Sequence, residues 1–164
     1  MIQLIDANAS HAEAIARIHN HAVLHSTAIW YDTPISVESR AAFIKSRQDA
    51  GFPFITAVDH DGAVLGYASY GEFRAFSGYR HTVEHLVYVA ETAQRQGIAS
   101  KLMHALMERA QNSQVHAMVG AIESGNLASL ELHRRLGFTE VGRMPEVGIK
   151  FGRWLDLSLM QKLL

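Results

Sequence analysis

Gln94-Arg95-Gln96-Gly97-Ile98-Ala99 joins an apolar run at residues 86–89 to a second apolar run at residues 102–107. The first run predicts a β-strand and the second an α-helix. A strand that ends in a glycine-containing turn and opens into a helix directs unpaired N–H groups and the positive end of the helix dipole to one spot. The sequence therefore predicts an anion site, where Gly97 lets the main chain approach the ligand, Ala99 keeps the first helical turn small and Arg95 adds positive charge.

This turn differs from the two best-known phosphate loops. It lacks the lysine and hydroxyl of a GxxxxGK[ST] loop and the three glycines of a dinucleotide fingerprint, so nucleotide hydrolysis and hydride transfer are poorly supported. Its pattern resembles Q/R-x-x-G-x-G/A, the acyl-CoA signature of the GCN5-related N-acetyltransferase (GNAT) family. For this motif alone, an ordinary strand-to-helix connection is the alternative interpretation.

Composition restricts the class of protein. The 164 residues predict a single domain, residues 1–164, and the net charge of -1 lacks the basic excess of a nucleic-acid binder. The chain has no cysteine, which excludes disulfides, iron–sulfur clusters and thiolate catalysis. Residues 1–10 have no basic flank or long apolar run and no stretch has membrane-spanning length, so we expect a cytoplasmic protein with no membrane partner.

Apolar periodicity and turn residues predict the remaining elements. Strands are expected at residues 2–6, 54–58, 63–70, 82–89 and 116–122, with closing strands near Val141 and at residues 151–163. Helices are expected at residues 11–24, from Ser36 to near Gly51, from the turn to about residue 111, and at residues 126–136. This order predicts an α/β or α+β sheet with helices on both faces.

A second motif lies downstream. The segment from Asn126 to Phe138 is similar to N-x-x-[AS]-x-x-x-[YH]-x-x-x-G-F, another acetyltransferase hallmark, although Asn126 alone could be a helix cap and Gly137 a helix stop. Residues 82–85, 132–138 and 150–156 resemble the branch that contains phosphinothricin and methionine sulfoximine/methionine sulfone acetyltransferases, and residues 28–31 and 66–71 look closer to the methionine sulfone type. The resemblance implies a GNAT-like mixed, mostly antiparallel sheet that is splayed at the cofactor strand.

Acetyl transfer to an amine requires a group that removes the ammonium proton, because alkylamines are mostly protonated at neutral pH. Glu84 precedes the expected thioester position, and burial could raise its pKa toward the working range. We therefore predict Glu84 as the base. Alternatively, Glu84 forms an ion pair with Arg74 or Arg80, or binds the substrate's ammonium.

The resemblance also implies which residues bind acetyl-CoA: backbone groups of the strand and the turn, with Asn126 holding the cofactor through its amide. The implied cofactor-binding residues are Val87, Tyr88, Val89, Arg95, Gln96, Gly97, Ile98, Ala99, Ser100 and Asn126. His133 stands where many relatives have the tyrosine that protonates the departing thiolate. Histidine can supply this proton near neutral pH, but solvent is an equal alternative.

For the acceptor, the resemblance implies contacts in the segment before and within the central strand. These substrate-binding residues are Arg74, Ala75, Phe76, Glu84, His85 and Leu86. Arginine binds carboxylates and phosphinates with two prongs, which favours Arg74, whereas Arg80 is more typical of a solvated loop. Trp30 and Tyr31 are expected to form the apolar wall of the pocket.

Ten histidines, His19, His21 and His25 among them, suggest a metal site, but no H-E-x-x-H motif is present and acyl transfer needs no metal, so none is expected. The sequence as a whole predicts an acetyl-CoA-dependent N-acetyltransferase for the α-amine of amino-acid analogues, active in detoxification. An acetyltransferase for protein amino termini or polyamines and a non-catalytic acyl-CoA-binding module are the alternatives. The resemblance also implies a homodimer, with Trp154 near the interface.

Overall fold

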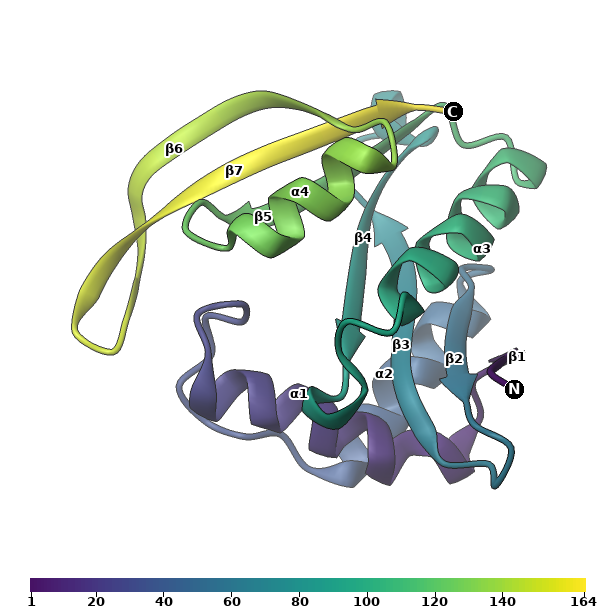
Figure 1. Cartoon of the computed structure of the whole chain (residues 1–164). Helices are drawn as coiled ribbons and strands as arrows, with labels where there is room; N and C mark the ends of the chain where they lie inside the picture. The colour runs from purple at the N-terminus through teal and green to yellow at the C-terminus, as the bar shows by residue number, and fades with distance from the viewer.

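A seven-stranded mixed sheet in the order β1-β2-β3-β4-β5-β7-β6 forms the centre of the computed structural model, which describes residues 1–164 (Figure 1). The strands are β1 Gln3–Asp6, β2 Phe54–Val58, β3 Val64–Glu72, β4 Thr82–Val89, β5 Ala117–Glu123, β6 Thr139–Lys150 and β7 Arg153–Leu163. The helices are α1 Ala12–His25, α2 Val37–Asp49, α3 Ile98–Asn112 and α4 Leu127–Arg135. Every neighbouring pair of strands is antiparallel except β4 and β5, which confirms the expected fold class.

Local signals in the sequence account for most element boundaries. The Ser36 hydroxyl caps α2 by accepting from the Ser39 N–H at 3.0 Å, and Asn126 caps α4 in the same way through Ser129. The expected closing strand at residues 151–163 was wrong at its start. Phe151 and Gly152 have φ values of 51° and 70° and form the turn between β6 and β7, because two successive left-handed residues reverse the chain instead of extending it.

The helices cover the two faces of the sheet, as Figure 1 shows, with α3 on one face and α1 and α2 on the other. The larger core cluster contains Leu102, Met103 and Leu106 of α3, and the smaller one contains Ile15 of α1 and Ile44 of α2. Because side chains alternate along a strand, β4 contributes to both clusters. Its residues 83, 87 and 89 face α3, whereas residues 86 and 88 face α1 and α2.

Strands β4 and β5 pair over a short stretch only. Residues 82–84 of β4 pair with residues 117–119 of β5, whereas the opposite edge of β4 stays paired with β3 as far as Val89. The last residues of β4 therefore have one edge with no strand partner, which is the splay implied by the family resemblance. None of the helices combines the length and the apolar character needed to cross a bilayer.

Candidate active site

A cavity of about 860 Å³ opens where β4 separates from β5. It is bounded by the free edge of β4, the first turns of α3 and α4, and one side of α1. The predicted site residues that line it are His85, Leu86, Val87, Tyr88, Val89, Arg95, Gly97, Ile98, Ala99, Ser100, Asn126 and His133. Side chains from both faces of the sheet line the cavity. Two reactants can therefore approach the free edge of β4 from opposite faces.

The turn before α3 has the geometry of an anion site. Gly97 adopts a φ of 76° at the start of α3, and a Cβ built there would meet no atom within 4 Å. The N–H groups of Ile98, Ala99 and Ser100 have no acceptor in the protein. Arg95, which also has a positive φ of 60°, lies beside them at the surface. Free amides, the helix dipole and a cation thus face one space that fits a pyrophosphate.

Asn126 has a structural role and a free donor. Its Oδ1 accepts from the Ser129 N–H at 3.1 Å and caps α4. Its Nδ2 has no acceptor within the protein, and the residue lines the cavity. The cap and the predicted cofactor contact are therefore compatible, because each uses a different atom of the same amide.

Several predicted residues lie outside the cavity. Gln96 is exposed and donates to the Thr92 carbonyl at 3.4 Å, so the turn carries its side chain away from the cavity. Residues 74–76, which were predicted to bind the acceptor, and Arg80 lie in the exposed connection between β3 and β4. The Arg74 guanidinium packs 4.2 Å from the ring centroid of Phe73 and donates to that residue's carbonyl.

Glu84 also lies outside the cavity, two residues before Leu86 on the face of β4 that is covered by α1 and α2. Its carboxylate is half-buried and takes part in none of the seven ion pairs of the protein. Burial raises the pKa of Glu84, whereas the positive charges of Arg74 and Arg47 oppose that rise. The pKa of Glu84 is therefore raised by burial, as the sequence predicted, and Glu84 forms no direct ion pair with Arg74 or Arg80.

His133 and His85 form a buried pair on the opposite face of the sheet. Their Nε2 atoms lie 3.1 Å apart, and Nδ1 of His133 lies 2.7 Å from the Ser129 carbonyl. Because a carbonyl can only accept, Nδ1 of His133 carries a hydrogen and donates it to Ser129. Burial lowers the pKa of His133 and lowers that of His85 to about 3, so both rings are neutral at pH 7.

In the neutral pair, His85 must donate its Nε2–H to the bare Nε2 of His133. His133 then has no N–H left for a thiolate, although it lines the cavity. This geometry speaks against His133 as the proton donor and favours the alternative, solvent. The sequence could not show this, because the state of His133 depends on His85, which lies 48 positions away on another element.

Sequence reasoning missed the contribution of α1, and in the loop that follows it named other residues. Six residues, Ile18, His21, Ala22, His25, Ser26 and Ala28, line the cavity opposite β4. The expected wall residue Trp30 does not, because its ring packs against the Gly148 backbone of β6, where a Cβ would come within 2.2 Å. The apolar composition of the loop at residues 26–32 does not by itself show which of its side chains face inward.

The three N-terminal histidines do not converge on one point. His21 and His25 share the exposed side of α1 with ring centroids 4.8 Å apart, and His21 lies 3.3 Å from the Glu91 carboxylate. His19 is instead buried, with Nδ1 3.5 Å from the Tyr67 hydroxyl. A metal site built from all three would require the helix to present two faces at once.

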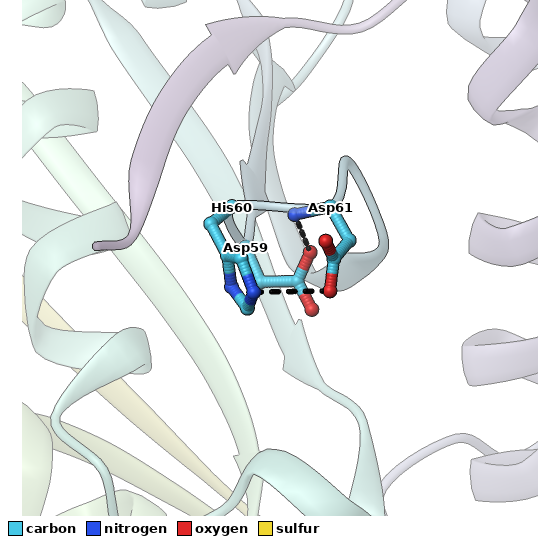
Figure 2. Close-up of side chains that lie close together, drawn as sticks. All are labelled: Asp59, His60 and Asp61. Carbon is cyan, nitrogen blue, oxygen red and sulfur yellow. Dashed lines mark hydrogen bonds and ion pairs between the residues drawn. The ribbon is translucent and has the colours of Figure 1, made fainter.

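A different group of possible ligand atoms lies in the turn between β2 and β3 (Figure 2). Oδ1 of Asp59 accepts from the N–H groups of Asp61 and Ala63 at 2.9 Å, and His60 lies 3.1 Å from the Asp61 carboxylate. Asp59 thereby closes the hairpin that the sequence predicted. These contacts stabilise an exposed turn, and none of the three side chains lines the cavity.

Known proteins resemble this chain along most of its length. Residues 15–138 match the description "Acetyltransferase (GNAT) family". The L-methionine sulfoximine/L-methionine sulfone acetyltransferase of Pseudomonas paraeruginosa is 51% identical over 95% of this chain and 91% of its own length. The phosphinothricin N-acetyltransferase of Alcaligenes faecalis is 38% identical over 91% and 76%. A putative acetyltransferase of Salmonella typhimurium, yncA, solved with its cofactor acetyl-CoA, has a TM-score of 0.97 and 45% identity, and the match covers 100% of this chain and 94% of that one.

Proposed function

This chain belongs to the acetyltransferase (GNAT) family, and we propose that it transfers the acetyl group of acetyl-CoA to the α-amine of small amino-acid analogues. The names of the relatives favour three acceptors for this chain: methionine sulfone, methionine sulfoximine and phosphinothricin. The observation that carries the proposal is the cavity itself, in which an unpaired strand edge leads directly to the free amides at the start of α3.

Two regions of backbone bind the acetyl donor. The N–H groups of Ile98, Ala99 and Ser100, with Arg95, bind the pyrophosphate of CoA. The free edge of residues 87–89 binds the amide-containing arm of the cofactor as a further strand would, and its N–H groups stabilise the charge that develops on the thioester oxygen. The Nδ2 group of Asn126 adds a side-chain contact.

For the chemistry, Glu84 accepts a proton from the acceptor's ammonium group, directly or through one water. The neutral amine then forms a C–N bond to the thioester carbon, the nitrogen gives up its extra proton to water, and the C–S bond breaks. The thiolate of CoA takes a proton from water, and Glu84 returns its proton to solvent. The raised pKa of Glu84 supports this role, because a carboxyl that holds protons more tightly is the better base. His133 contributes by holding the His85 ring beside the cavity.

For the acceptor, Glu84, His85 and Leu86 surround the reacting amine, and Arg74, Ala75 and Phe76 cover its outer end. The segment 74–76 is exposed, which suits a region that orders when the acceptor binds. The positive charge of Arg74 opposes the rise in the pKa of Glu84, which supports a role for both side chains at the same acceptor.

We also propose that the chain forms a homodimer and acts in the cytoplasm in detoxification. Support for the dimer comes from the family resemblance and from the long β6–β7 hairpin, which extends beyond α4 in Figure 1. Large apolar side chains are exposed along it, among them Val141, Met144, Val147, Ile149 and Trp154. Analytical ultracentrifugation over a range of concentrations tests the dimer, which should dissociate in Trp154→Glu.

The central test measures thiol release from acetyl-CoA with a panel of amines: methionine sulfone, phosphinothricin, a peptide amino terminus and spermidine. We expect the two amino-acid analogues to be preferred and Glu84→Gln to lower kcat by about 100-fold or more. Glu72→Gln, which alters an exposed carboxylate on the adjacent strand, is the matched control and should retain full activity. Absence of thiol release with every amine would leave only a CoA-binding module.

A further inference from the structure

Arg40 of α2 is a buried cation without a counter-ion. Its side chain is 5% exposed, and it forms no hydrogen bond or ion pair. The guanidinium lies 5.0 Å from the ring centroid of Phe43 and 6.0 Å from that of Tyr67, and Nε is fully enclosed. A buried charge with no partner is strongly destabilising, so proteins rarely keep one without a use.

His19 of α1 supplies a second unpartnered polar group at the same place. It is 7% exposed, its Nε2 has no hydrogen-bond partner, and its Nδ1 lies 3.5 Å from the Tyr67 hydroxyl. Burial, Arg40 and Lys150 together lower the pKa of His19 to about 4, so the ring is neutral at pH 7. When the Tyr67 hydroxyl donates to Nδ1, the Nε2–H of His19 is left free to donate.

Both groups lie on the face of the sheet that carries the proposed base. Glu84, Leu86 and Tyr88 alternate along β4 and face α1 and α2. The ring of Tyr88 lies 6.4 Å from that of His19, and Tyr88 also lines the cavity. Burial raises the pKa of the Tyr88 hydroxyl, the positive charge of Arg40 lowers it and the negative charge of Glu84 raises it, so both charges are felt at Tyr88.

The site lies near the surface. Tyr31, on the loop after α1, is exposed, and its ring lies 6.2 Å from the His19 ring. Arg40, His19, Tyr67 and Tyr88 therefore form one group of donors that is lined with aromatic rings, next to the cavity and close to the surface.

We propose that Arg40 and His19 bind the α-carboxylate of the acceptor, which makes the enzyme selective for α-amino acids over amines that lack this group. The inference rests on the proposed function, since it concerns the same acceptor. Arg40 presents a planar fork of N–H groups that matches a carboxylate, and His19 adds one N–H. The bound carboxylate supplies the negative charge that the buried guanidinium lacks.

The choice between the two candidate arginines follows from what each must recognise. Methionine sulfone, methionine sulfoximine and phosphinothricin share an α-carboxylate and differ at the end of the side chain. A fixed, buried arginine suits the constant group, whereas the exposed Arg74 on the β3–β4 connection suits the variable end. Loss of Arg74 should therefore affect acceptors unequally.

Arg40 could instead serve the fold alone, as a cation between two aromatic rings, and the two roles predict different effects of Arg40→Met on acceptor binding. Replacing a buried, unpaired charge by an apolar side chain of similar length is often neutral or stabilising. If Arg40 serves the fold alone, Arg40→Met leaves acceptor binding unchanged. If it binds the carboxylate, the variant keeps or gains thermal stability and loses affinity for amino acids.

The experiment compares L-methionine sulfone with its decarboxylated amine, 3-(methylsulfonyl)propan-1-amine, in wild type, Arg40→Met and Arg40→Lys. We expect Arg40→Met to raise KM for the amino acid by about 10- to 100-fold and to leave KM for the decarboxylated amine unchanged, with Arg40→Lys in between. Arg47→Met is the matched control, because Arg47 lies 4.9 Å from the same Phe43 ring, and it should leave the ratio of the two KM values unaltered.

Equal KM values for the two acceptors in wild type, or equal changes for both in Arg40→Met, would overturn the inference. A loss confined to phosphinothricin would do so too, since it would assign Arg40 to the phosphinate. Calorimetric titration with L-methionine sulfone makes the same comparison without turnover. If no variant, wild type included, releases thiol, the proposed function fails while a binding difference between wild type and Arg40→Met still decides the role of Arg40.

Discussion

Gly120 of β5 provides the space that the His85 imidazole occupies, because a Cβ at position 120 would lie 2.7 Å from Nε2 of His85. The same Cβ would lie 3.6 Å from the His133 ring. His85 cannot easily move away, since its ring stacks on that of His133 with an interplanar angle of 12° and packs against Phe138. The absence of a side chain on β5 is therefore what allows the histidine pair to form at the point where the strands separate.

Gly120→Ala should consequently destabilise the protein and disturb the cavity. We expect a loss of about 1–3 kcal/mol in the free energy of unfolding, typical of an overpacked core, together with weaker CoA binding. Urea denaturation and calorimetry measure the two effects. Gly142→Ala is the control, because its added methyl would have its nearest neighbour at 3.9 Å, and a loss of similar size there would remove the explanation.

Gly97→Ala tests the proposed pyrophosphate site. A methyl group there meets no protein atom, so the variant carries only the strain of a left-handed alanine, about 1 kcal/mol, and a side chain that projects toward the ligand. We expect CoA to bind about 10-fold more weakly. Gly51→Ala has the same strain, with a φ of 79° and open space, but lies far along the chain at the end of α2. Equal CoA affinities in the two variants would move the phosphate contact elsewhere.

The pH dependence of turnover should report Glu84. Because burial raises the pKa of this carboxyl, kcat/KM should fall on the acidic side at a pH above the ordinary titration range of glutamate, and this acidic limb should vanish in Glu84→Gln. Arg47 and Arg74 oppose the rise. Arg47→Met should therefore shift the acidic limb to still higher pH, whereas Arg80→Ala should leave it in place. An acidic limb that neither Glu84→Gln nor Arg47→Met changes would belong to another group.

Stability should decline in mild acid because of the buried histidines. The pKa values of His19 and His85 are lowered to about 4 and about 3, so the unfolded chain binds more protons than the folded one below pH 6.5. The free energy of unfolding is therefore at its full value above pH 6.5 and falls as the pH drops toward 4, with each residue contributing a loss of about 2 kcal/mol between pH 6.5 and pH 5.

His19→Gln isolates one of these contributions. It should reduce the slope of unfolding free energy against pH in that range by about one proton per molecule, measured by urea denaturation at several pH values. An unchanged slope in His19→Gln would show that this ring is not held neutral in the folded protein.

The sequence by itself determined the order of the elements and the donor side of the site. The turn at residues 94–99 and the cap at Asn126 are local features, since a positive φ, a side-chain cap and a switch from strand to helix periodicity each depend on a few neighbouring residues. These features need no knowledge of the remainder of the chain. Two of them at the right spacing were enough to predict a site for acetyl-CoA.

Only the tertiary structure decided the acceptor side. Arg40 precedes Phe43 and Ile44 by three and four residues, so helical spacing already put it on the inward face of α2, but an arginine in a sequence is ordinarily taken to be solvated. Its burial, the pairing of His85 with His133, and the exclusion of Trp30 from the cavity all depend on how helices, loop and sheet pack together. Side chains that are far apart in the chain meet at these contacts, and the local sequence does not reveal how favourable such contacts are.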